Sequence, residues 1–176
     1  MATMTLVAPP KTAVTPNPPL ISVLTQLQMR TAELLAEAYT FSEIAKELCR
    51  SEGAIKNSLK IAYAKLGIAD GAKWVILGCM AFNERMRARA SEEGHLDEFS
   101  GKKLSDIFTE SEMAVARYIS EGKLSRQIAP KMGWKREQTV RNVLQEMYDK
   151  CGFSNRLELA LQVHYEKFHA ERERSA

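Results

Sequence analysis

Apolar side chains recur at helical spacing through most of the chain from Leu24 onward. The clearest stripe has spacings of four, three and four residues and consists of Ile55, Leu59, Ala62 and Leu66. Such spacing puts every member on one face of a helix and leaves the opposite face to polar residues. Ser51 precedes the stripe where an N-terminal cap belongs, and Gly67 follows it where a helix ends in a left-handed residue. The pattern predicts an amphipathic helix between these two residues.

Two capping boxes predict shorter helices before this one. In a capping box a Ser or Thr and a Glu or Gln three residues later bond to each other's backbone N–H groups. Thr25 with Gln28 starts a helical run that continues to about Ala38. Thr40 with Glu43 starts a second, shorter run. Three helices in close succession are therefore expected.

A fourth helix is predicted from Ala69-Asp70 to about Arg89. Its centre, 74–82, is apolar on nearly every side, and such a helix must be covered on two sides. Its own unit covers one side, and a second unit, a second chain or both cover the other. The last helix of the chain offers another surface of this kind. The candidates for a dimer or interdomain contact are Trp74, Ile76, Leu77, Met80, Leu157 and Leu161.

The whole pattern recurs later in the chain. At an offset of 84 residues, and then of 85, the matching pairs include Thr25 with Thr109, Ile44-Ala45 with Ile128-Ala129, Asn57 with Asn142 and Gly67 with Gly152. The change of offset places one extra residue near Trp134-Lys135-Arg136, in a turn, where insertions are tolerated. A repeat of this length indicates two duplicated domains, because solenoid repeats are much shorter.

This repeat defines the organisation of the chain. Residues 1–20 hold five of the six prolines and no helical period, which predicts a disordered N-terminal tail. A first unit at 21–89 and a second unit at 108–172 follow, joined by a polar linker at 90–107. No run of alternating apolar and polar residues predicts a strand. The expected fold is all-α, with two tandem four-helix domains.

Three short helices with a compact turn between the second and third are the elements of a helix-turn-helix unit. The third helix enters the DNA major groove, so its outer face needs cationic and hydrogen-bonding side chains. In the first unit Lys56, Asn57 and Lys60 lie off the apolar stripe. Arg50 and Ser51 precede the helix, where backbone N–H groups and a positive charge hold a phosphate. A solvated helix face is the plainer interpretation of one such helix, and the four-helix pattern favours DNA.

Longer motifs point to a family. The first unit carries Ile44-Ala45-Lys46-Glu47-Leu48, Ser51-Glu52-Gly53-Ala54-Ile55-Lys56-Asn57 and Lys65-Leu66-Gly67-Ile68. The second unit carries Phe108-Thr109-x-x-Glu112, Glu121-Gly122, Ile128-Ala129, Thr139-Val140-Arg141-Asn142 and Ser154-Asn155-Arg156-Leu157-Glu158-Leu159-Ala160. In combination these motifs resemble the LuxR-type (GerE-type) DNA-binding domain over about 24–82 and 108–165. The resemblance implies, in a bacterial transcription regulator, a winged-helix-like four-helix domain whose third helix reads DNA and whose fourth often forms a dimer contact.

The resemblance and the turn residues together give the DNA-binding candidates. In the first unit they are Arg50, Ser51, Gly53, Ala54, Lys56, Asn57 and Lys60. In the second unit they are Lys135, Arg136, Thr139, Arg141, Asn142 and Gln145.

The second unit departs from the first in two ways. Pro130 lies inside its second helix, and we expect it to kink or shorten that helix. Glu146 and Asp149 stand in its third helix where the first unit has Ile61 and Ala64, and acidic groups repel phosphates. We therefore expect the first unit to read DNA. The second reads a different sequence, grips only the backbone, or contacts protein.

Composition narrows the function classes. The formal net charge of +3 is compatible with nucleic acid but does not demand it. Cys49, Cys79 and Cys151 are too far apart for a disulfide framework or zinc site, so mostly buried thiols in a reducing cytoplasm are expected. No signal peptide or membrane span is visible, the longest apolar run being 74–82. Without a nucleophile–base motif, phosphate loop or metal-ligand spacing, neither enzymatic activity, a metal nor a cofactor is predicted.

Two functions remain open. The first is a sequence-specific regulator that binds double-stranded DNA in the cytoplasm at the nucleoid, either as a homodimer or as an intramolecular pseudo-dimer. The second is a protein-interaction co-regulator or anti-activator on a helix-turn-helix frame, whose partner is another regulator or RNA polymerase. A sigma-factor-like part that contacts promoter and polymerase together is a variant of the second. RNA remains an alternative ligand, although no aromatic stacking platform is evident.

Overall fold

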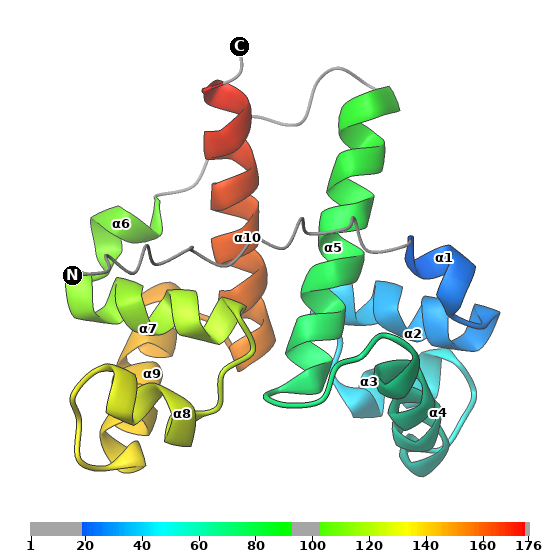
Figure 1. Cartoon of the computed structure of the whole chain (residues 1–176), viewed down its shortest axis with the longest axis horizontal. Helices are drawn as coiled ribbons and strands as arrows, with labels where there is room; N and C mark the ends of the chain where they lie inside the picture. Colours follow the sequence, from blue (N-terminus) through cyan, green and yellow to red (C-terminus); the bar gives the residue numbers. More distant parts are fainter. Residues whose placement is uncertain (1–18, 93–102, 175–176) are drawn as a thin grey trace, which may run out of the picture.

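The computed structural model describes residues 19–92 and 103–174, and within these ranges every regular element is a helix (Figure 1). Helices α1–α5 make up the first helical set: Leu20–Val23, Gln26–Ala36, Phe41–Glu47, Glu52–Lys65 and Lys73–Glu92. Helices α6–α10 make up the second helical set: Leu104–Ile107, Glu110–Ser120, Ser125–Lys131, Glu137–Cys151 and Arg156–Glu173. The all-α prediction is confirmed. The described ranges contain no strand and therefore no β-wing, so the winged-helix-like detail is wrong for them.

The predicted caps form as expected. The Thr25 hydroxyl accepts from the backbone N–H of Gln28, and the Gln28 amide oxygen accepts from the Thr25 N–H at 3.1 Å. The same reciprocal pair forms at Thr40 with Glu43 at the start of α3. The Ser51 hydroxyl accepts from Ala54 N–H at 3.2 Å and caps α4. Each cap satisfies N–H groups that the first helical turn leaves without a partner.

The predicted start of the fourth helix is wrong by several residues. It was expected near Ala69-Asp70, but α5 begins at Lys73. The reason is a contact with the second helical set, since the Ala72 N–H donates to the Gly122 carbonyl oxygen at 2.7 Å. Gly71 lies before it in the left-handed region at φ 87°. This turn therefore reaches across to the other set before the helix begins.

Two short helices lie where a tail and a linker were predicted. Leu20 opens α1 and is 1% exposed, although the predicted tail ran to residue 20. Leu104 opens α6 and is 2% exposed, although the predicted linker ran to residue 107. The two ends of these segments are therefore packed. Residues 1–18 of the tail and 93–102 of the linker lie outside the described residues.

Both short helices are held from a distance by a carboxylate. The Leu20 N–H donates to Glu84 on α5 at 2.7 Å, and the Leu104 N–H donates to Glu166 on α10 at 2.7 Å. A carboxylate at a helix N-terminus makes a charge-assisted hydrogen bond and meets the positive end of the helix dipole. The 84-residue offset between the two leucines was the available signal for these helices, because it equals the offset of the repeat.

The proline in α8 does not shorten that helix. Both α3 and α8 have seven residues, so the predicted shortening by Pro130 is wrong. Pro130 is the next-to-last residue of α8, and its ring therefore removes only one hydrogen bond near the helix end. The predicted extra residue is confirmed, since four residues separate α3 from α4 and five separate α8 from α9.

Packing repeats in the two sets. Helix α5 packs on α2, α10 packs on α7, and α5 and α10 also pack on each other. Figure 1 shows α5 and α10 side by side in the middle of the molecule. The cysteines follow this core only in part: Cys79 on α5 is buried and Cys151 is half-buried. Cys49 is exposed, which corrects the expectation of a buried thiol, because it lies in the α3–α4 turn at φ 50°.

One buried position distinguishes the two sets. Gln28 on α2 is 3% exposed and donates to the Ser58 carbonyl oxygen at 3.2 Å. Its counterpart Glu112 on α7 is 5% exposed and accepts from Lys150 Nζ at 2.5 Å. Burial by itself would raise the pKa of Glu112, but hydrogen bonds from Lys150 and Thr109 outweigh it and hold the pKa below its ordinary value. The second set therefore contains a buried carboxylate paired with the exposed Lys150, where the first set has a neutral amide.

We expect the substitution Glu112→Gln to lower the free energy of unfolding at pH 7 by about 1–2 kcal/mol, because a charge-assisted hydrogen bond is lost. A carboxyl whose pKa is lowered by folding stabilises the protein above its unfolded pKa, and this contribution disappears as the pH falls through the folded value. The difference between the urea-unfolding curves of wild type and variant should therefore be largest above the unfolded pKa of about 4.3 and shrink as the pH falls below it. Glu146→Gln, at an exposed position of α9, is the control. A constant difference between wild type and Glu112→Gln across this pH range would contradict the assignment.

Candidate nucleic-acid interface

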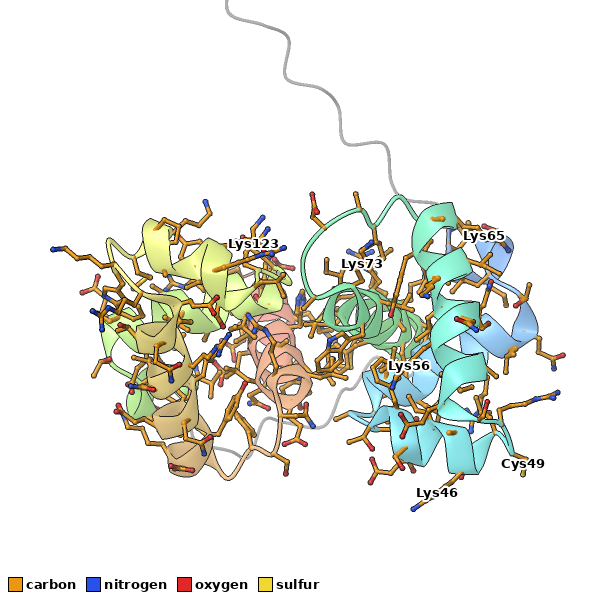
Figure 2. All side chains as sticks on the ribbon, turned by 90° about the horizontal axis from the view of Figure 1, so that it is seen from below. Lys46, Cys49, Lys56, Lys65, Lys73 and Lys123 are labelled. Atoms are coloured by element: carbon orange, nitrogen blue, oxygen red, sulfur yellow. The ribbon has the colours of Figure 1, made fainter. Side chains whose placement is uncertain are left out.

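The two predicted recognition helices lie on the same face of the molecule. Figure 1 shows α3 and α4 at the same end of the structure as α8 and α9. Seen from that end, α4 and α9 lie on opposite sides of α5 and α10, and both are fully in view (Figure 2). The side chains of Lys46, Lys56 and Lys65 from the first set are visible from this end. This end of the molecule is called the recognition face below and comprises the exposed sides of α4 and α9.

Helix α4 turns its apolar stripe inward, as predicted. Ile55, Leu59 and Ala62 are each at most 1% exposed, whereas Lys56, Asn57 and Lys60 are exposed. The ammonium of Lys56 lies 2.8 Å from Glu52 and 5.5 Å from the centre of the Phe41 ring. Asn57 and Lys60 have no hydrogen-bond or ion-pair partner among the described residues. Their donors are therefore available to a ligand without breaking any internal contact.

The turn before α4 presents backbone donors. Arg50, Gly53 and Ala54 are exposed, and a Cβ on Gly53 would meet only the Ser51 hydroxyl, at 4.0 Å. The Ser51 hydroxyl is already used to cap α4, since it accepts from the Ala54 N–H. The N-terminus of the 14-residue helix carries partial positive charge and is open to solvent. All the predicted contacts of the first set are thus accessible in the folded chain.

One exposed residue of this face, Ile61, is not among the candidates that the sequence motifs indicate. Ile61 is 57% exposed, which is unusual for a large aliphatic side chain. It follows Asn57 by four residues and Ala54 by seven, so all three share the outer side of α4. An aliphatic group there can contact the methyl group of thymine. The i, i+3, i+7 spacing of Ala54, Asn57 and Ile61 was the available signal.

The outer side of α9 carries polar groups that are engaged with one another. All six candidates are exposed: Lys135, Arg136, Thr139, Arg141, Asn142 and Gln145. Arg141 lies 2.6 Å from Glu137, Asn142 accepts from Gln138 at 2.9 Å, and Gln145 donates to Asp149 at 3.0 Å. A ligand must compete with these three exposed pairs, each of which contributes little to stability.

A close approach of backbones joins the two sets. Besides the 2.7 Å bond from Ala72 to Gly122, a Cβ on Gly122 would lie 2.3 Å from the side chain of Ile76. Gly122 also has a φ of 72°, which disfavours any residue with a Cβ. Further along α5, a Cβ on Gly78 would lie 2.9 Å from Leu157 on α10. A Cβ at either position would require a side chain of the opposite set to move, so the two sets meet at short range.

The six predicted dimer or interdomain residues separate into groups. Ile76 and Leu157 line the contact between the sets, through Gly122 and Gly78. Leu77 and Leu161 are buried core residues, at 0% and 9% exposure. Trp74 and Met80 are half-buried, and Trp74 meets the ring of Phe41 edge-on at 6.2 Å within its own set.

A histidine lies in the contact between the sets. His164 Nδ1 on α10 is 3.2 Å from the side-chain nitrogen of Asn83 on α5, and His164 Nε2 is 3.3 Å from the Ser120 carbonyl oxygen. A neutral ring that carries its proton on Nε2 satisfies both contacts at once. Burial lowers the pKa of His164, and the charge of Lys167 acts in the same direction. The contact therefore favours an uncharged imidazole.

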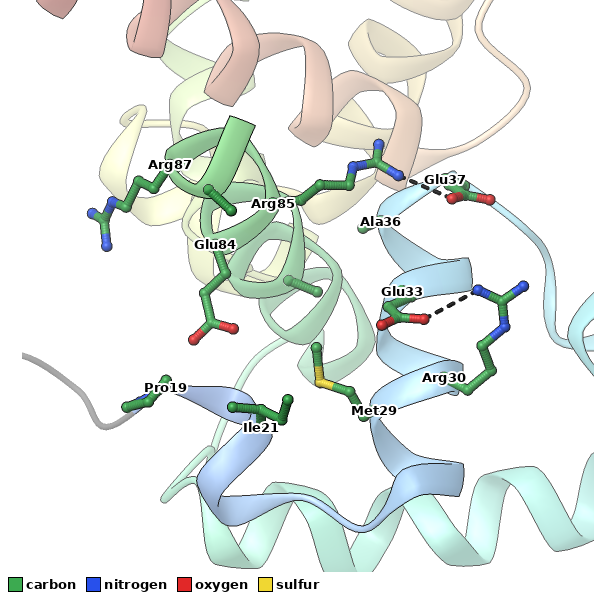
Figure 3. A pocket seen from close by; sticks show the side chains of 12 residues that line it. Pro19, Ile21, Met29, Arg30, Glu33, Ala36, Glu37, Glu84, Arg85 and Arg87 are labelled. Atoms are coloured by element: carbon green, nitrogen blue, oxygen red, sulfur yellow. Dashed lines mark hydrogen bonds and ion pairs between the residues drawn. The ribbon is translucent and has the colours of Figure 1, made fainter. Parts of the chain in front are cut away.

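A groove lies between α1, α2 and α5, away from α4 (Figure 3). Its volume is about 660 Å³, and Ile21, which is 76% exposed, forms one wall together with Met29. Charged pairs border it, Arg30 with Glu33 at 3.1 Å and Arg85 with Glu37 at 2.9 Å. The corresponding groove of the second set, about 810 Å³, is lined by more polar residues, His164 and Lys167 among them.

Part of the chain is similar to a known protein family. Residues 106–163 match the family model of the bacterial regulatory proteins of the luxR family. The match runs from α6 into α10 and so contains α9 with its exposed candidates. It lies in the second unit, whereas the sequence pattern favours the first unit as the DNA reader. No curated protein and no solved structure matches the chain.

Other site types find little support in the described ranges. No group of His, Cys, Asp or Glu side chains there is arranged to hold a metal ion. None of the helices described is both long enough and apolar enough to cross a membrane.

We expect the stability of the protein to fall as the pH is lowered from about 7 towards 5, in part through His164. A histidine whose pKa is lowered by folding binds protons more readily in the unfolded chain, so unfolding becomes easier as the pH falls below the unfolded value of about 6.5. The variant His164→Gln keeps a donor and an acceptor for Asn83 and Ser120 but cannot titrate. Its denaturant midpoint should therefore change less than that of the wild type between pH 7.5 and 5.5. If the denaturant midpoints of wild type and variant change equally with pH, His164 does not contribute to the pH dependence of stability.

Proposed function

We propose that this protein is a sequence-specific DNA-binding transcription regulator that acts through two helix-turn-helix units. The observation that carries the proposal is the recognition face. There α4 and α9 both present exposed polar side chains, and neither helix is covered by the other helical set. The luxR-family match over residues 106–163 supports DNA-binding transcription regulation independently of that geometry. A site of action in the cytoplasm, at the nucleoid, is part of the same proposal.

The two units contribute differently to this function. Helix α4 has three lysines and one glutamate, whereas α9 has an arginine and a lysine against three acidic residues. Phosphate contacts supply most of the affinity of DNA-binding proteins, and base contacts supply sequence preference. The first unit therefore supplies most of the electrostatic attraction. The second unit supplies base contacts through Arg141 and Asn142, with Lys135 and Arg136 placed to meet phosphate.

A protein-interaction role is the second candidate, and the groove in Figure 3 favours it. An exposed Ile21 beside Met29, bordered by charged pairs, suits an amphipathic helix of another regulator or of RNA polymerase. This role is compatible with DNA binding, because the groove lies on a different part of the first helical set from the outer side of α4.

We expect the double substitution Lys56→Ala and Lys60→Ala to weaken binding to DNA and to flatten its dependence on salt. Each phosphate contact that is lost should reduce the slope of log K against log salt by about 0.9, so a reduction of about 1.8 is expected. The measurement is fluorescence anisotropy with a labelled 40-base-pair duplex of mixed sequence, at several salt concentrations. Folding should be little affected, since the contacts of Lys56 with Glu52 and with the ring of Phe41 are both made by an exposed ammonium group.

The matched control is Lys167→Ala. Lys167 is also an exposed lysine near a glutamate one helical turn away, 3.9 Å from Glu171. It lies in the later part of α10, which Figure 1 shows extending away from α4 and α9. Unchanged affinity and slope for this variant, together with losses for the double variant, support the proposal. Equal behaviour of both variants would remove α4 from the DNA contact and favour the protein-interaction role.

A further inference from the structure

We propose that one chain, acting as a monomer, binds one duplex at two unlike half-sites, α4 reading one and α9 the other. This inference rests on the proposed function and adds the form of the DNA target to it. It is carried by three observations: the joint between the sets, the cover of the apolar helix, and the chemistry of the two outer helix sides.

The joint fixes the position of one recognition helix relative to the other. The Ala72 N–H bonds to the Gly122 carbonyl oxygen at 2.7 Å, and the side chain of Ile76 fills the space that a Cβ on Gly122 would need. The packing of α5 on α10 extends this joint over several helical turns, through Gly78 with Leu157 and Asn83 with His164. Packed contacts of this kind do not deform continuously. The two outer helix sides are therefore presented at one spacing and one orientation.

The apolar helix is already covered within one chain. On α5, Val75, Leu77, Cys79, Phe82 and Met86 are all at most 7% exposed. Cover for this helix was one reason to expect a second chain, beside the dimer contact that the family resemblance implied, and α2 and α10 pack on it within one chain. The Phe82 ring also meets Tyr165 of α10, with the ring centres 6.4 Å apart. One chain thus holds two recognition helices without a partner subunit.

The outer sides of the two helices differ in chemistry. They share an asparagine, Asn57 and Asn142, the side chain that pairs with adenine through two hydrogen bonds. Around it α4 has aliphatic Ile61, which suits the thymine methyl group. At the corresponding place α9 has Glu146, which can accept from the amino group of cytosine. Arg141 of α9 corresponds to Lys56 of α4, and both cations suit guanine.

The two half-sites should therefore each contain an adenine and differ around it. The difference is expected at the base pair read by Ile61 or Glu146, an A·T pair in the half-site of α4 and a G·C pair in that of α9. A homodimer with one recognition helix in each chain presents two identical readers and selects a palindrome. A single chain with two different readers selects an asymmetric sequence instead.

The test is selection of DNA by the full chain from duplexes with a randomised 40-base-pair core. We expect two unlike motifs at a fixed spacing and in one relative orientation, and a complex of one chain per duplex by analytical ultracentrifugation. A palindromic motif with two chains per duplex would overturn the inference and leave the proposed function standing. A single uninterrupted motif would do the same. Failure to enrich any sequence, with no binding to mixed-sequence DNA, would overturn both.

A second measurement tests the joint directly. Five base pairs inserted between the selected motifs turn one half-site to the opposite side of the duplex. Affinity should then fall by about 100-fold, the lower part of the gain expected from linking two binding modules. Unchanged affinity would mean that the two units move independently, which contradicts a fixed joint.

A matched pair of glycine variants distinguishes the effect of disturbing the joint from the effect of backbone strain alone. Gly122→Ala and Gly152→Ala both place a Cβ at a φ of about 70°, but only Gly122 has neighbours within 4 Å. The Gly122 variant should lose at least half of the dependence on spacing, whereas the Gly152 variant should keep it. If Gly122→Ala does not fold, the stoichiometry and the insertion experiment on the wild-type chain still decide the inference.

Discussion

The packing of α5 against its neighbours is the constraint on which this structure depends. The centre of this helix, 74–82, is apolar on nearly all sides. Exposing such a surface to water is unfavourable by roughly 25 cal/mol for each Å² of apolar area. Covering it requires the first set on one side and α10 on the other. Two glycines, Gly78 and Gly122, allow the approach, because side chains of the opposite set occupy the space that a Cβ would take. The relative position of the two units follows from this cover.

That position determines what the molecule offers to a ligand. With α5 and α10 in the middle, α4 and α9 lie at the same end and their outer sides remain uncovered. The side chains that make α4 amphipathic have two roles. Ile55 and Leu59 pack the helix onto its core, and Lys56 and Lys60 remain exposed on the opposite side. The same division occurs in α9, where Val140 and Leu144 are buried beneath Arg141 and Gln145.

The two sets are built alike but have diverged in charge. A neutral amide at Gln28 corresponds to an ion-paired carboxylate at Glu112, and the exposed Ile61 corresponds to Glu146. The first difference lies in the core and concerns stability. The second lies on the recognition face and concerns what each unit can bind. The luxR-family match falls on the second set, whose α9 has three acidic residues where α4 has one.

The sequence by itself determined the features that depend on neighbouring residues. Caps such as Thr40 with Glu43, the apolar stripe of α4 and the all-α fold follow from spacings of three and four residues, which are local. The tertiary structure decided the features that depend on distant residues. Helices α1 and α6 are held by Glu84 and Glu166, which lie 64 and 62 residues away from the N–H groups they accept from. Contacts between the sets likewise decide where α5 begins, which helices cover it, and that α4 and α9 lie at the same end. No local pattern encodes these contacts.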